Sequence, residues 1–238
     1  MAIYAIGDLH MPGHQEKPMN VFGAHWERHF DVIRENWLSV IKPEDTVLIP
    51  GDISWAMQME DVRDDLNEIA SLPGKKLILR GNHDYCWNSI GKVRAMLGEN
   101  MHAIQNDAIE IDGVVYCGTR GWSIPFPGQP FSEQDEKIYQ REILRLEMTL
   151  QAATKYHLPI VVMMHFPPLY RDILNTGFTE VLERYPVETV VYGHLHGQGI
   201  KIAFEGVRRG IMYHLVSCDA LQFMPKYIEK TSFSTENN

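Results

Sequence analysis

The stretch Thr46-Val47-Leu48-Ile49-Pro50-Gly51-Asp52 shows most clearly how this chain is expected to fold. Its apolar, β-branched run predicts a buried strand that ends at the glycine. Glycine allows the backbone to turn there, so the carboxylate of Asp52 is presented just outside the sheet. Other segments end in metal-binding side chains in a similar way: Gly7-Asp8-Leu9-His10, Gly81-Asn82-His83-Asp84, Gly193-His194-Leu195-His196 and, without the glycine, His165 after an apolar run.

Strands and helices alternate in the first half of the chain. We predict strands at residues 2–6, 46–49 and 77–79, a helix along the apolar stripe from Trp26 to Ile41, and a second helix around residues 57–71. The interval from Asp52 to Asn82 is about the length of one βαβ unit. This half therefore favours an α/β arrangement of parallel strands, with ligands collected at the carboxyl ends of the strands.

The second half mixes hairpins, one long helix and further strands. A hairpin is predicted around Asp112-Gly113, and a helix with its N-cap at Ser132 carries an apolar stripe from Tyr139 to Leu150. Strands are predicted at residues 160–164, 189–192, 200–204 and 211–216, the last two antiparallel to each other. No linker or repeat is evident, so we expect one domain over residues 1–238, with a loosely held polar tail from about residue 226.

Composition limits the classes of partner. The formal net charge of −9 argues against a nucleic-acid polymer, because such partners usually require a cationic face. Three cysteines without a Cys-x-x-Cys pair fit a reducing compartment. The longest apolar stretch is too short to cross a bilayer, and no export signal precedes the first strand. We therefore expect a cytoplasmic protein without a membrane partner; its oligomeric state stays open.

The spacing of the polar residues suggests shared metal ions. Asp8 and His10 are separated by one residue, so on an extended backbone both side chains would point the same way, and His194 and His196 have the same spacing. Asp52 is suited to bridging two cations through its two oxygens. With the amide of Asn82 and the imidazole of His165, seven ligands are available, which is too many for one tetrahedral zinc ion and natural for two adjacent cations.

The predicted metal centre is cationic. Two divalent cations carry about four positive charges, and two carboxylates with one bridging hydroxide remove about three of them. The other ligands are neutral, so the centre is expected to attract an anion such as a phosphorylated substrate. Mixed imidazole, carboxylate and amide ligands suit manganese, iron or zinc better than calcium, and the sequence does not choose among these metals.

The ordered set Asp-x-His, Gly-Asp, Gly-Asn-His-Asp, His and Gly-His-x-His, from Asp8 to His196, resembles the calcineurin-like metallophosphoesterase superfamily. The resemblance implies a four-layer sandwich in which two packed mixed β-sheets are flanked by helices. It also implies two overlapping ligand sets, namely Asp8, His10, Asp52 and His196 for the first metal, and Asp52, Asn82, His165 and His194 for the second.

The resemblance further implies hydrolysis by in-line attack of a hydroxide that bridges both metals. His83 would face the substrate and stabilise the developing charge or protonate the departing oxygen, and Asp84 would accept a hydrogen bond that orients the His83 ring. Protein Ser/Thr phosphatases carry Gly-Asp-x-x-Asp-Arg-Gly, but here Trp55 replaces the second Asp and the Arg is missing. A small phosphomonoester or phosphodiester, with nucleotides among the candidates, is therefore expected rather than a phosphoprotein.

Two other functions and several minor candidates remain open. The chain could be a non-catalytic scaffold, although no ligand block is eroded, or a dinuclear hydrolase of an amide or lactone. Histidines outside the blocks are expected to be structural or at the surface: His14, His25, His29, His102, His157 and His214. Aromatic residues near the blocks could stack a base or simply pack loops: Trp55, Tyr85, Trp87, Trp122, Phe126 and Tyr170. Arg80, Arg120 and Arg171 could contact phosphate or pair with acidic neighbours.

Overall fold

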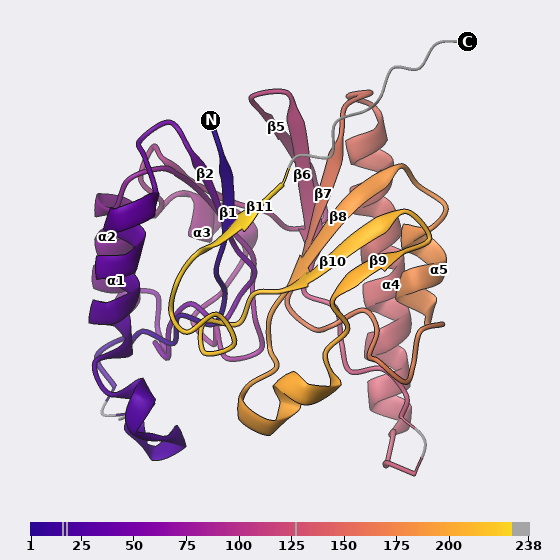
Figure 1. The fold of residues 1–238 in the computed structure, drawn as a ribbon, viewed down its shortest axis with the longest axis horizontal. Coiled ribbons are helices and arrows are strands. Elements are labelled where there is room, and N and C mark those ends of the chain that lie inside the picture. Colours follow the sequence, from indigo (N-terminus) through magenta and orange to yellow (C-terminus); the bar gives the residue numbers. More distant parts are fainter. Residues whose placement is uncertain (16, 18, 127, 230–238) are drawn as a thin grey trace.

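The computed structural model consists of two β-sheets that face each other, with α1 (His29–Val40) and α2 (Arg63–Ser71) on one outer side and α4 (Glu133–Thr154) and α5 (Gly177–Leu182) on the other (Figure 1). The structure describes residues 1–15, 17, 19–126 and 128–229. Each sheet contains both parallel and antiparallel neighbours. Two mixed sheets flanked by helices confirm the predicted fold class.

Most neighbouring strands in the two sheets are also consecutive along the chain. The first sheet has the order β11 (Lys226–Ile228), β1 (Ile3–Ala5), β2 (Thr46–Ile49), β3 (Lys75–Ile78) and β4 (Met101–Ala103). The second has the order β5 (Ala108–Ile111), β6 (Val114–Thr119), β7 (Ile160–Met164), β8 (Val187–Tyr192), β10 (Ile211–Leu215) and β9 (Gly206–Arg208). The short helix α3 (Ile90–Arg94) precedes β4. None of the described helices combines the length and hydrophobicity that a membrane span requires.

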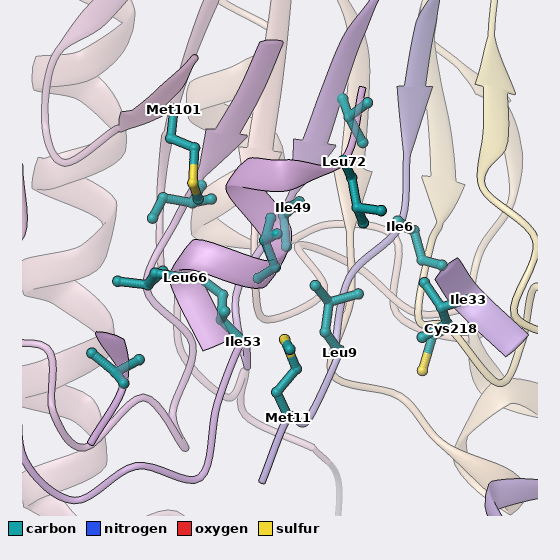
Figure 2. Packing of buried hydrophobic residues seen from close by; sticks show 14 of the residues in the cluster. Ile6, Leu9, Met11, Ile33, Ile49, Ile53, Leu66, Leu72, Met101 and Cys218 are labelled. Atoms are coloured by element: carbon teal, nitrogen blue, oxygen red, sulfur yellow. The ribbon is translucent and has the colours of Figure 1, made fainter. Parts of the chain in front are cut away.

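Apolar side chains fill the three interfaces between the four layers. Leu48, Leu77 and Met163 belong to the cluster between the sheets. A second cluster joins α1 and α2 to the first sheet, and Figure 2 shows Leu66 of α2 among its members. A third joins α4 and α5 to the second sheet. Every residue of β2 and β7 is buried, which is the pattern of strands covered on both faces.

The long helix begins where its sequence predicts. The side chain of Ser132 accepts a hydrogen bond from the backbone N–H of Asp135, and the Asp135 carboxylate accepts one from the Ser132 backbone, which completes a capping box. Helix α1 begins later than its apolar stripe predicted. Arg28 has a left-handed φ of 53°, so Trp26 lies in the separate 3₁₀ helix η2 (Ala24–Trp26), which follows η1 (Met19–Phe22).

Two predictions about the end of the chain are wrong. Residues 200–202, predicted as part of a strand, lie in the 3₁₀ helix η3 (Gly197–Ile202), and the antiparallel partner of β10 is β9 instead. The carbonyls of Ala203 and Phe204 accept hydrogen bonds from the side chains of Arg171 and Tyr192, and Ala203 forms only an isolated antiparallel bridge with Tyr170. The tail was expected to be loose from about residue 226, but β11 pairs with β1 and buries Ile228. Residues 230–238 lie outside the described residues.

Candidate metal centre

The first motif lies where the ends of the two sheets meet. The backbone N–H of Gly7 donates to the carbonyl of Val216 at 2.7 Å, which joins the end of β1 to the end of β10. On the other side, the N–H groups of Asp8 and His10 donate to the carbonyls of Gly51 and Asp52, both at 3.0 Å. The first motif, which follows β1, is therefore held between the segments that follow β10 and β2.

Turns rather than extended strands set the direction of the predicted ligands. Strand β1 ends at Ala5, and the φ angles of Asp8, His10, Asp52 and His194 are 58°, 45°, 50° and 74°. The extended backbone expected at Asp8 and His10 is therefore wrong, although both side chains still reach the same group of ligand atoms. A left-handed conformation at a residue other than glycine costs on the order of 1–3 kcal/mol, and it persists where surrounding contacts over-determine it, often at a functional site.

The glycines before the ligands make room for neighbouring ligand loops. Gly51 has a φ of 95°, and a Cβ placed there would lie 2.7 Å from the backbone N of Gly81 and 2.8 Å from Nδ1 of His165. A Cβ on Gly81 would overlap the backbone N and Oδ1 of Asp52, and one on Gly193 would overlap the carboxylate of Asp8. The glycine of the pattern therefore permits close approach of the loops as well as a turn.

We expect Gly81→Ala to destabilise the protein by about 3 kcal/mol or more, because the new methyl group would displace Asp52 from the centre of a buried hydrogen-bonded cluster. Gly91→Ala in α3 is the matched control, since a Cβ there meets nothing within 4 Å and alanine favours a helix by about 0.5–1 kcal/mol. Urea unfolding of both variants measures the difference. Equal stability of the two variants would contradict the close packing.

The seven predicted ligands converge in two adjacent groups. Asp8, His10 and His196 place one ligand atom each within 4.8 Å of one another, and so do Asp52, His165 and His194. Oδ1 of Asn82 lies 2.6 Å from Nε2 of His165. This grouping follows the two ligand sets that the family resemblance implies.

Asp52 belongs to the second group and also faces the first. Its Oδ2 is 4.0 Å from Nε2 of His10 in the first group and 3.4 Å from Nε2 of His165 in the second. Its Oδ1 accepts a hydrogen bond of 2.8 Å from the backbone N–H of His83, which fixes the carboxylate. One Asp52 oxygen therefore faces ligand atoms of both groups, the position that a bridging ligand needs.

Hydrogen bonds to Nδ1 direct the Nε2 atoms of two histidines inward. Nδ1 of His165 donates to the carbonyl of Pro50 at 3.0 Å, and Nδ1 of His196 pairs with Oδ1 of Asp219 at 2.8 Å. Such outer partners fix the orientation of metal-binding imidazoles. Asp219 was missed by sequence reasoning: it lies shortly after the predicted strand at 211–216, as Asp8 and Asp52 lie after theirs, but no glycine precedes it.

Burial keeps most of the predicted imidazole ligands neutral. It lowers the pKa of His10 and of His194 to about 3, and it lowers the pKa of His165 as well. These rings are therefore unprotonated at neutral pH and can offer a lone pair. Nε2 of His10 lies 3.4 Å from Nε2 of His196. The lone pairs of these two atoms could therefore bind the same cation.

The buried carboxylates create a demand for positive charge. Burial and the charge of Asp8 raise the pKa of Asp52 to about 8. Burial alone would raise the pKa of Asp8, but the charge of His196 and its hydrogen bond hold that pKa well below its usual range. Burial would lower the pKa of His196, yet Asp8 and Asp219 raise it to about 10. In the metal-free chain, the positive charge of protonated His196 thus balances the negative charge of the neighbouring carboxylates. A bound divalent cation can supply this positive charge instead. The donor set fits divalent metal ions.

Asp84 has a different role from the predicted one. Its carboxylate accepts backbone N–H groups from Gly81 at 2.6 Å, Asp52 at 3.0 Å, Ile53 at 2.8 Å and Ser54 at 3.2 Å. The prediction that Asp84 orients the His83 ring is therefore wrong, because its oxygens hold the second and third motif loops together. Burial and the charge of Asp52 raise the pKa of Asp84 to about 6.

Tyr85 orients His83 instead. Its hydroxyl lies 2.9 Å from Nδ1 of His83, and it is the second residue after the histidine, so both come from one loop. The ring of His83 lies beside the groups of ligands, with its centroid 5.9 Å from that of His10 and 4.6 Å from that of Trp55. His83 is thus placed at the edge of the site rather than inside either ligand group.

Of the other residues considered from the sequence, some make structural contacts and others lie near the ligand groups. His29 is buried against the carbonyl of Leu9 at 2.8 Å, whereas His14 pairs with Asp64 at the surface. Arg171 donates to the carbonyl of Ala203, and Arg120 lies 4.0 Å from Glu142. Among the aromatic residues, Trp87 belongs to the core, and Trp55 stacks on His10 with ring centroids 4.9 Å apart. Burial raises the pKa of Cys86 to about 12, which disfavours a thiolate nucleophile.

Comparisons with known proteins identify the family of the chain. The family model described as calcineurin-like phosphoesterase matches residues 1–198. No curated protein matches the chain significantly. Among solved structures, the phosphopantetheinyl hydrolase of Mycobacterium tuberculosis shares 16% identity over 91% of this chain and 88% of that chain, with a TM-score of 0.54, and supports the fold. A protein of unknown function from Aquifex aeolicus shares 18% identity over 95% of each chain, with a TM-score of 0.46.

Proposed function

Because the chain belongs to the calcineurin-like phosphoesterase family, we propose that it is a metal-dependent hydrolase of small phosphate esters that uses two divalent cations. The observation that carries this proposal is the position of Asp52, whose Oδ2 faces Nε2 of His10 on one side and Nε2 of His165 on the other. All predicted ligand blocks converge there, which disfavours a non-catalytic scaffold.

The proposed division of ligands follows the two groups in the structure. Asp8, His10, Asp52 and His196 would hold one cation, and Asp52, Asn82, His165 and His194 would hold the other. When bound, two divalent cations lower the pKa of water and offset the charge of a phosphate group. The nitrogen and oxygen donors suit manganese, iron or zinc.

His83 is the proposed acid for the departing oxygen. Its Nδ1 is paired with the hydroxyl of Tyr85, so Nε2 is the ring nitrogen left to reach a substrate. Its backbone N–H is bonded to Asp52, which ties the position of the ring to the metal-binding loop. Burial lowers the pKa of His83, and the phosphate of a bound substrate would favour its protonated form again. Proton transfer to a departing oxygen contributes about 10²–10⁴ in rate.

Hydrolysis of chromogenic phosphate esters tests this proposal. Purified protein is stripped of metal with a chelator and then assayed with p-nitrophenyl phosphate and bis-p-nitrophenyl phosphate, before and after manganese, iron or zinc is restored. We expect turnover of at least one ester that disappears on stripping and returns with metal. The monoester and diester measured in parallel show which class is preferred. Undiminished turnover by the stripped protein, or none with any restored metal, would contradict the proposal.

A further inference from the structure

A pocket of about 270 Å³ opens beside the candidate metal centre. One part of its lining belongs to the site already described, and the other part is apolar and aromatic. The first part consists of His10, His83, His196, Gly197 and Asp219, and the second consists of Met19, Phe22, His25, Trp26 and Trp55. We call this space the aromatic pocket. It is continuous with the centre because His10 and His196 belong to both.

The apolar wall is built mainly by the segment between the first motif and α1. The 3₁₀ helices η1 and η2 supply Met19, Phe22 and Trp26. Gly23 separates the two helices with a φ of 131°, a conformation that glycine adopts readily. Apart from Trp55, the wall therefore comes from a stretch that contributes no metal ligand, so this stretch can determine what organic group the site accepts without changing the metal centre.

Two tryptophans of the wall are held firmly in place. Trp26 is only 3% exposed and packs edge-on against His196, with ring centroids 5.6 Å apart, and against Phe223 at 5.5 Å. Trp55 stacks on His10, and its Nε1 donates to the sulfur of Met19 at 3.3 Å. These contacts give the aromatic pocket a preformed shape, as is usual for a site that binds a small molecule.

Phe22 differs from the rest of the wall. Its side chain is 64% exposed although it lines the pocket, so it lies at the mouth with little packing of its own. Its neighbour Val21 is 72% exposed and is not part of the lining. Exposed aromatic rings at the mouth of a cavity are suited to stacking on a bound planar group.

The chemistry of the lining specifies an amphipathic ligand. A phosphate would lie at the cationic centre, and an apolar planar group would extend along Trp26 and Phe22. The volume of about 270 Å³ is near the lower end of small-molecule pockets, roughly 300–1,000 Å³, so it suits a single ring system rather than a polymer. Aromatic side chains favour ring stacking over contact with a flexible alkyl chain, because their faces and edges interact with specific geometry.

We propose that the aromatic pocket binds an aromatic ring carried by the leaving group of the phosphate ester. This inference rests on the proposed phosphoesterase function. The assignment to the leaving group follows from His83, which lines the pocket and is the residue placed beside the departing oxygen. The substrate class is thus the phosphate esters of alcohols that bear an aromatic ring a short distance from the ester oxygen.

Two esters with similar leaving alcohols provide the first test. 2-Phenylethyl phosphate and ethyl phosphate both release a primary alcohol, but only the first carries a ring. We expect a higher kcat/KM for 2-phenylethyl phosphate, and we expect Phe22→Ala to lower it by about 5- to 150-fold, which corresponds to the roughly 1–3 kcal/mol of one ring stacked on an aromatic side chain. The same variant should lower kcat/KM for ethyl phosphate far less, because that ester carries no ring. Val21→Ala is the matched control and should affect neither ester.

A binding measurement separates this inference from the proposed function. 3-Phenylpropylphosphonate and propylphosphonate are not hydrolysed, and their affinities for the metal-loaded protein can be measured by calorimetry. If the phenyl compound binds more tightly and Phe22→Ala abolishes this preference, the aromatic pocket is supported even if no ester is turned over. The absence of turnover would overturn only the proposed hydrolysis. Equal affinities, or an equal loss for both phosphonates in Phe22→Ala, would overturn the aromatic pocket and leave phosphate hydrolysis standing.

Discussion

Replacement of His83 by alanine is expected to leave both cations bound and to lower kcat by about 10²–10⁴. The side chain of His83 belongs to neither ligand group, so its loss removes no metal contact. The backbone N–H that bonds to Asp52 remains in His83→Ala, so the central carboxylate keeps its orientation. Steady-state kinetics and elemental analysis of the same preparation measure turnover and metal content together.

Tyr85→Phe provides a graded control for His83→Ala. It removes only the hydroxyl that bonds to Nδ1 of His83 and retains the ring, so we expect a smaller loss of turnover, about fivefold, which is the effect of about 1 kcal/mol from one hydrogen bond. Full activity of His83→Ala would exclude the proposed role of this residue. A loss of metal from His83→Ala would show that His83 acts through the metal centre and not on the substrate.

Asp52→Asn is expected to have the larger effect, because it should disrupt both metal positions at once. Asparagine has nearly the same shape, but it has lost the negative charge that faces both ligand groups. Substitution of outer partners costs about 10–100-fold in metal affinity, and we expect the loss of a bridging ligand to cost more than this. Elemental analysis and titration with manganese followed by calorimetry measure the change.

Asp219→Asn is the matched control for Asp52→Asn. Asp219 is also an acid of the site, but it contacts Nδ1 of His196 and the N–H of Gly197. Unlike Asp52, it does not face both ligand groups. Its substitution should therefore cost no more than about 10–100-fold in affinity. If Asp52→Asn bound two cations as tightly as the unchanged protein, Asp52 would not bridge them.

Local sequence patterns predicted the parts of the site that depend on strands. The run before Asp52 contains buried β-branched residues, and the chain leaves the sheet at Gly51 as expected. The same pattern placed Asn82 and His165 at strand ends, and within each sheet these ends lie at one edge because β2 is parallel to β3 and β7 is parallel to β8. Ligands that follow parallel strands gather at one edge of a sheet, and each short segment shows both the strand and the ligand that follows it.

Features that depend on contacts between distant segments could not be predicted in this way. The left-handed turn at His10 is stabilised by a hydrogen bond to the carbonyl of Asp52, and Asp84 binds N–H groups of a loop about thirty residues earlier. Strand β11 is only three residues long and is recognisable by its pairing with β1. The sequence predicted one helix from Trp26 to Ile41, because the left-handed residue Arg28, which separates Trp26 from α1, gives no signal in the hydrophobic pattern.

The proposal that two cations share Asp52 can be tested directly. Crystals grown with manganese and measured near the manganese absorption edge would locate the ions directly by their anomalous scattering. The proposal predicts two peaks on either side of the Asp52 carboxylate, one beside His10 and His196 and the other beside His165 and His194. A single peak, or peaks away from these residues, would contradict it.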